Sequence, residues 1–78
     1  MGLPEIVAMK QTYTAIVKQD EGVWIGWVEE LPGVNCQEDT REELLESLRI
    51  TLAEAIELNR TEAREAAGEG YEEFSVAL

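Results

Sequence analysis

The sequence contains no histidine and only one cysteine among its 78 residues. Histidine is the commonest general base and the commonest metal ligand near neutral pH, so this sequence lacks the usual side chain for both functions. A cysteine–histidine nucleophile cannot be assembled from this chain for the same reason. A single cysteine also forms no internal disulfide, which fits a reducing compartment.

Long apolar runs are also missing. No segment approaches the ~20 apolar residues that span a bilayer, and the opening MGLPEIVAMK has no basic head followed by a long apolar run. We therefore expect a soluble, cytoplasmic protein without a membrane partner.

Basic residues are few. Six Lys and Arg stand against seventeen Asp and Glu, which gives a formal net charge of −11. Nucleic acid is bound largely by neutralising phosphates with basic side chains, so no direct nucleic acid binding is expected. Charge of this sign attracts a basic partner. The simpler interpretation is that the acid keeps a small protein soluble.

The length predicts one domain, residues 1–78, with one modest core. Domains this small usually need a source of stability besides the hydrophobic core, and no internal disulfide is available here. Oligomerisation can supply that stability, and we expect a homodimer or a higher oligomer.

Residues 9–37 have the alternation and turn residues of three antiparallel strands. In QTYTAIVK, the side chains of Tyr13, Ala15 and Val17 share one face. The turn DEG then leads into VWIGWV, and the turn LPG at 31–33 leads into a short third strand. The second strand is apolar on both faces, which predicts a central strand or a face covered by another chain.

Residues 40–60 have the pattern of a helix packed on that sheet. Thr40 is a preferred N-cap, and Glu43 completes a capping box. The apolar stripe comprises Leu44, Leu45, Leu48, Leu52, Ala55 and Ile56.

The two ends of the chain are less regular. Residues 61–70 continue the helix, form a second short helix or form a loop, which Gly68 and Gly70 end. Residues 71–78 alternate, with Phe74, Val76 and Leu78 on one face, and predict a last strand on the sheet edge or on a partner's sheet. Residues 1–8 are a flexible tail or an extension of the first strand.

None of the side-chain clusters has the spacing of a reaction centre. Cys36 is a small apolar filler more often than a reactive thiol in such a position. Acid pairs at turns and at a helix start are normally solvated, although such pairs also hold magnesium or do acid–base work. No glycine-rich phosphate loop occurs. We therefore expect no enzyme activity, catalytic residue, metal or cofactor.

The two tryptophans, three residues apart, suggest a platform for stacked bases. On a strand, however, Trp24 and Trp27 point to opposite faces, and the basic groove that such a platform needs is missing. The better interpretation is core packing for one and an interface anchor for the other.

The order of these elements along the chain resembles that of the HicB-type antitoxin domain. The resemblance covers residues 13–60: an aromatic-led first strand, a D-x-G turn, a second strand, a P-G turn, a short strand before D-T, and an E-E-L helix. The matching residues are Tyr13, Asp20, Gly22, Leu31, Pro32, Gly33, Asp39, Thr40, Glu42 and Glu43. Glu38 departs from the family, which often has glycine there.

The resemblance implies a partial ribonuclease-H-like fold with a sheet and a helix, and no nuclease activity. Together with the residue patterns above, we expect an α+β fold with a three-stranded antiparallel sheet, one long helix packed on it and a C-terminal strand. The resemblance also implies an antitoxin of a HicAB-type toxin–antitoxin pair, which binds and masks a small basic toxin, HicA, that cuts messenger RNA with a histidine. We expect the short, single-domain form, without the second, DNA-binding domain of many members and without operator binding.

The residues expected to bind the toxin are Trp24, Trp27, Glu29, Glu30, Glu38 and Asp39. Two other functions stay open at this point. One is a self-associating structural or regulatory module without a toxin partner. The other, which the sequence favours least, is a magnesium-dependent nuclease inherited from the fold.

Overall fold

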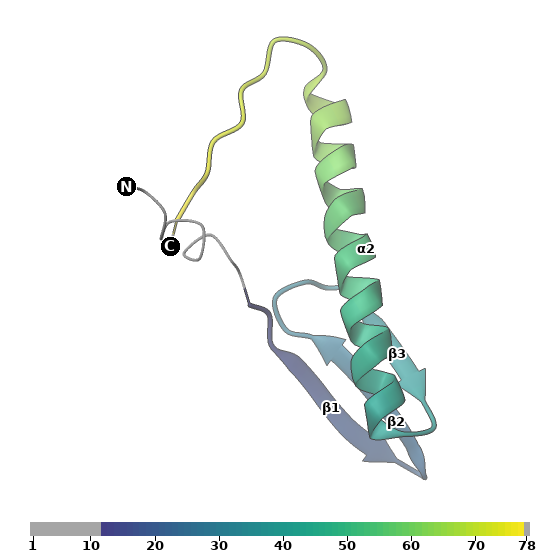
Figure 1. Cartoon of the computed structure of the whole chain (residues 1–78). Helices are drawn as coiled ribbons and strands as arrows, with labels where there is room; N and C mark the ends of the chain where they lie inside the picture. The colour runs from purple at the N-terminus through teal and green to yellow at the C-terminus, as the bar shows by residue number, and fades with distance from the viewer. Residues whose placement is uncertain (1–11, 78) are drawn as a thin grey trace.

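The computed structural model describes residues 12–77, which form three strands and one long helix (Figure 1). The strands are β1 (Ala15–Asp20), β2 (Val23–Val28) and β3 (Asn35–Glu38), and the helix is α2 (Arg41–Ala67). The strands form one antiparallel sheet in the order β1-β2-β3. The predicted α+β class, with a three-stranded antiparallel sheet and one long helix, is confirmed.

The β1–β2 hairpin follows from two turn residues with positive φ. Glu21 has φ 54° and Gly22 has φ 82°, which is the backbone twist that a two-residue hairpin turn needs. The register pairs Asp20 with Val23 and Ala15 with Val28. The predicted DEG turn is therefore confirmed.

The strands are shorter than the predicted range 9–37. Residues 9–11 lie outside the described part, and β1 begins only at Ala15. At Thr14 the ladder becomes irregular, because its N–H donates to the Glu30 side chain while its C=O accepts from Glu29 N–H. After the turn at Gly33, where φ is 96°, β3 runs from Asn35 to Glu38. Strand β2 is the central strand, as its two apolar faces predict.

The core lies between the sheet and the first half of α2. Its buried residues are Val28, Val34, Leu44 and Leu48, and Val17, Trp24 and Leu52 pack against them. The helix packs on β2 and β3. These side chains come from alternate strand positions and from the predicted helical stripe, so both periodicities are confirmed.

The helix begins where the sequence predicts. The Thr40 Oγ1 accepts a hydrogen bond from Glu43 N–H at 3.1 Å, and Glu42 and Glu43 place acid in the first turn. The helix continues past the range 40–60 without a break to Ala67, which is one of the alternatives given for residues 61–70, and Gly68, with φ 74°, caps it. Residues 61–67 are polar but rich in Ala, Glu and Arg, which are good helix formers, so polarity alone does not end the helix.

The predicted last strand over 71–78 is not confirmed. Residues 71–77 are extended but belong to no strand, and they lie beside the second half of α2 (Figure 1). The predictions for residues 1–8 and for residue 78 fall outside the described residues. Within the described part, α2 is not apolar enough to cross a membrane despite its length.

Candidate partner-binding surface

The sheet has one face that no described element covers. On β2 this face carries Val23, Ile25 and Trp27, since Trp24, Gly26 and Val28 point toward the helix. Neighbouring strands add Ile16, Lys18, Asn35 and Gln37 at paired positions. We call these seven residues the open face.

The open face is apolar at its centre and slightly hollowed. Trp27 is 38% exposed, and Ile16, Val23 and Ile25 are half-buried. A shallow hollow of about 320 Å³ runs between β2 and β3, with Trp27 and Ile25 on one side and Asn35 and Gln37 on the other. Lys18 is the one basic residue among the seven. A partially exposed aromatic beside aliphatic side chains is typical of a protein-binding surface.

The two tryptophans predicted to bind a partner lie on opposite faces of β2. Trp24 pairs with Glu38 in the register and packs against the core under α2. Trp27 pairs with Asn35 and faces outward. The structure therefore brings only Trp27 to the open face.

Glu29 and Glu30 lie at one end of the open face, directly after β2. Both side chains are exposed. The Glu30 Oε1 accepts the Thr14 N–H at 2.8 Å, and this hydrogen bond holds the pKa of Glu30 below its usual value of 4.5. Glu30 thus keeps its negative charge at this end of the sheet.

Glu38 and Asp39 lie at the opposite end, directly after β3. The Glu38 Oε2 accepts a hydrogen bond from Ser47 Oγ at 2.5 Å, while Asp39 is exposed. The β1–β2 turn and the start of α2 reach the same end (Figure 1), and they bring further acids: Asp20, Glu21, Glu42 and Glu43. Arg41 is the basic residue of this group.

The six predicted residues therefore do not form one cluster. Trp24 is the β2 partner of Glu38, and Val28 immediately precedes Glu29, so four strand residues lie between the two acid pairs, which are about 17 Å apart along the strand. The hairpin turn and the helix start enlarge the second group, which was not predicted from the sequence. Ile16 and Ile25 were not among the predicted residues either, although the alternation in β1 and β2 places them with Trp27.

The described residues contain no group of three or more His, Cys, Asp or Glu side chains that could hold a metal ion. Cys36 lies on the helix-facing side of β3, half-buried, with its Sγ 3.5 Å from Thr51 Oγ1 in a weak hydrogen bond. The surface thus presents an apolar centre with acidic residues beyond both ends.

Comparison of the chain with protein-family models, with curated proteins and with solved structures finds no match.

Proposed function

We propose that this chain is the antitoxin of a HicAB-type toxin–antitoxin pair and acts in the cytoplasm. In this role it binds a small basic toxin that cleaves messenger RNA, masks the toxin and performs no chemical step itself. The finer fold that goes with this function is partial ribonuclease-H-like, with residues 71–78 as a last strand. The resemblance over residues 13–60 supports the antitoxin role and the ribonuclease-H-like sheet and helix, and the alternation in residues 71–78 supports the last strand.

One observation carries the proposal: the open face has an apolar centre, with acids beyond both of its ends. Trp27, Ile25 and Ile16 supply contact area that a partner can desolvate. Glu29 and Glu30 at one end, and Asp39 at the other, supply charge of the sign that a basic toxin needs. A standard interface of about 1,600 Å² in all involves about 20–30 residues on each partner, more than the seven of the open face, so it would extend to both acidic ends.

The net charge of −11 supports the same partner class. Opposite charge raises association rates by roughly ten to a thousandfold at low salt, so a strongly acidic protein captures a basic ribonuclease quickly. The same negative charge disfavours non-specific binding of the antitoxin to RNA, because the phosphates of RNA repel it. Masking then depends on contact with the toxin alone.

Growth rescue tests this function in cells. A HicA-type toxin is expressed from one inducible promoter and this chain from another, and colony growth is counted. Relief of the growth arrest by the chain, and loss of the relief with Trp27→Asp, is the expected result. Growth arrest that persists while the chain accumulates in soluble, folded form would contradict the proposal.

A second function is favoured by a different observation. Phe74 and Val76 are 82% and 79% exposed at the end of the chain, which suits a module that associates with itself. Such a structural or regulatory module needs no toxin. A gene for a small basic protein with one histidine beside the gene for this chain supports the antitoxin, and its absence supports the module.

A further inference from the structure

The hollow of about 320 Å³ on the open face, which we call the Trp27 hollow, is lined by polar groups without a partner of their own. Trp27 and Ile25 of β2 lie on one side of it. Asn35 and Gln37 of β3, their partners in the register, lie on the other. Within residues 12–77, no hydrogen bond or ion pair uses the Trp27 indole N–H or the two side-chain amides. These groups are therefore available to a ligand.

Glu29 adds a free carboxylate at one end of the Trp27 hollow. It follows Trp27 by two residues, which is the spacing of neighbours on one face of a strand, about 7 Å apart. The Glu29 N–H donates to the Thr14 C=O at 2.9 Å, so the pairing of β1 with β2 continues through this residue. Glu30 accepts the Thr14 N–H, whereas the exposed Glu29 side chain has no hydrogen bond or ion pair within residues 12–77. Of the two acids, Glu29 is thus the one whose carboxylate is free to bind a cation.

No basic residue of the described chain lines the Trp27 hollow. Lys18, the one cation of the open face, is the β1 partner of Ile25 and so lies on the side of β2 away from β3. The hollow lies on the β3 side of β2. A cation that enters it beside Trp27 therefore meets an aromatic ring and the negative charge of Glu29, and no like charge in the lining.

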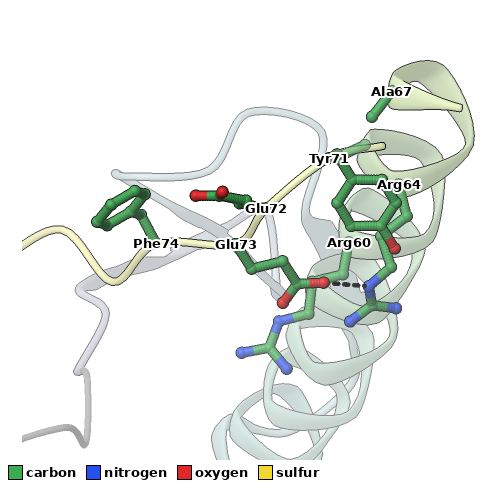
Figure 2. A pocket seen from close by; sticks show the side chains of 8 residues that line it. Arg60, Arg64, Ala67, Tyr71, Glu72, Glu73 and Phe74 are labelled. Carbon is green, nitrogen blue, oxygen red and sulfur yellow. Dashed lines mark hydrogen bonds and ion pairs between the residues drawn. The ribbon is translucent and has the colours of Figure 1, made fainter. Parts of the chain in front are cut away.

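The chain combines the same kinds of group at a second place. A hollow of about 490 Å³ lies between the second half of α2 and residues 71–74, and Arg64, Tyr71 and Glu73 are among the residues that line it (Figure 2). Glu73 Oε2 lies 3.2 Å from Arg64 Nε. A guanidinium, an aromatic ring and a carboxylate thus line one hollow there. The Trp27 hollow has the ring and the carboxylate but not the guanidinium.

A guanidinium suits the Trp27 hollow better than an ammonium or an apolar side chain. It is planar and always charged, and it presents five N–H donors and no acceptor. Its flat face stacks on a tryptophan ring, while its N–H groups bind carboxylate and amide oxygens at the edge of the ring. A lysine ammonium lacks the flat face. An apolar side chain would cover Glu29 and the two side-chain amides without giving them partners, which costs free energy.

We propose that the Trp27 hollow binds an arginine side chain of the toxin, with the guanidinium stacked on the Trp27 indole and paired with the Glu29 carboxylate. The side-chain oxygens of Asn35 and Gln37 accept its remaining N–H groups. This inference deepens the proposed function and rests on it, because it names the side chain that anchors a basic toxin on the open face.

NMR titration of the full chain with single amino acids tests the site without a toxin. The probes are the N-acetyl amides of arginine, of lysine and of citrulline, which is an uncharged isostere of arginine, at constant ionic strength. Acetyl-arginine amide is expected to shift the Trp27 indole N–H signal saturably. The Trp24 signal, from the helix-covered face of β2, is the internal control and stays in place. The lysine probe is expected to bind roughly threefold or more weakly, and the citrulline probe is expected to cause no saturable shift.

Two substitutions assign the binding to its side chains, with the Asn35 side-chain amide signal as the readout. Glu29→Gln is expected to weaken arginine binding roughly threefold, since it removes an exposed ion pair. Trp27→Leu keeps an apolar side chain but removes the ring, so the preference for arginine over lysine is expected to disappear. Glu62→Gln, at an exposed position of α2, is the matched control for charge and leaves binding unchanged. Equal shifts with citrulline, or unchanged affinity in Glu29→Gln, would overturn the site.

A HicA-type toxin then shows whether the partner uses the site. Each arginine of the toxin is replaced by lysine in turn, and calorimetry measures binding to the wild-type chain and to Trp27→Leu. One of these substitutions is expected to weaken binding to the wild-type chain roughly fivefold and to have little effect on binding to Trp27→Leu. A toxin that binds without any arginine coupled to Trp27 would overturn the inference and leave the antitoxin proposal standing. A toxin that does not bind at all would contradict the antitoxin proposal, while the amino acid titration decides the site itself.

Discussion

Gly26, at the centre of β2, lies directly beneath Leu48 of α2. A Cβ atom at position 26 would come within 2.9 Å of Leu48 Cδ1, 3.1 Å of the Ile16 C=O oxygen and 3.2 Å of Leu44 Cδ2. Glycine at this position lets the helix approach the sheet closely. The same contact fixes which face of the sheet is covered, and hence which face stays open to a partner.

Gly26→Ala is expected to lower the free energy of unfolding by about 1–3 kcal/mol, because the added methyl group overpacks the helix–sheet contact. Chemical denaturation followed by tryptophan fluorescence measures the change. Ala53→Ser, on the exposed side of α2, is the control and is expected to change stability by less than about 0.5 kcal/mol. A Gly26→Ala variant as stable as the wild type would show that the helix does not lie this close.

Thr40→Ala removes the acceptor for the Glu43 N–H at the start of α2. The expected loss of stability is about 1 kcal/mol, whereas Thr40→Ser keeps the hydroxyl and most of the stability. Thermal unfolding of the three proteins measures both values. Equal losses for the two substitutions would mean that the hydroxyl does not cap the helix.

Glu30 gives stability a defined dependence on pH. Its pKa is lowered in the folded chain, so its hydrogen bond to Thr14 N–H stabilises the fold above the usual carboxyl pKa of 4.5. That contribution is lost as the pH falls through the lowered pKa of Glu30. Glu30→Gln is expected to reduce the fall in stability between about pH 5 and pH 3. Denaturation midpoints measured across this range test it, and identical pH profiles would contradict it.

The two tryptophans are expected to respond oppositely to truncation. Trp24→Ala removes a side chain that packs against the core and is expected to cost about 2–4 kcal/mol of stability. Trp27→Ala removes a side chain of the open face, so stability changes little, while toxin binding weakens roughly 30-fold or more. Calorimetric titration with a HicA-type toxin measures the binding. Ile50→Ala, an exposed apolar position on α2, is the control whose toxin affinity stays unchanged.

Charge at the two ends of the open face is expected to set the rate of toxin binding. Replacing Glu29 and Asp39 by Lys is expected to slow association roughly tenfold or more at low salt, with a smaller effect at high salt. Replacing Glu62 and Glu65 by Lys changes the net charge equally, but on the second half of α2. Stopped-flow association rates compare the two variants. Equal slowing would mean that only net charge matters and not its position.

The features predicted correctly from the sequence are those that neighbouring residues determine. The hairpin turn depends on the positive φ of Glu21 and Gly22, and the helix start depends on the hydroxyl of Thr40 three residues before Glu43. The two faces of β2 follow from alternation alone. In each case the cause and its consequence lie within a few residues of each other.

The features that the sequence did not predict depend on distant pairings. Glu29 and Asp39 are ten residues apart in the chain, but antiparallel pairing of β2 with β3 sends them to opposite ends of the sheet. Leu45 fits the core stripe, yet it is exposed, because the core lies under Leu44 and Leu48, and the sheet of residues 12–77 has three strands. By contrast, continuation of the helix past Thr61 was one of the alternatives open for residues 61–70, and its cause is local, because good helix formers follow Thr61 up to Gly68.

The claim that this protein masks a toxin is tested most directly by adding it stepwise to a purified HicA-type toxin and following the cleavage of a labelled messenger RNA. We predict that cleavage falls to background near equimolar protein, that Trp27→Asp restores cleavage, and that the protein alone leaves the RNA intact. Cleavage that continues unchanged at severalfold excess of folded protein, or cleavage by the protein alone, would contradict it.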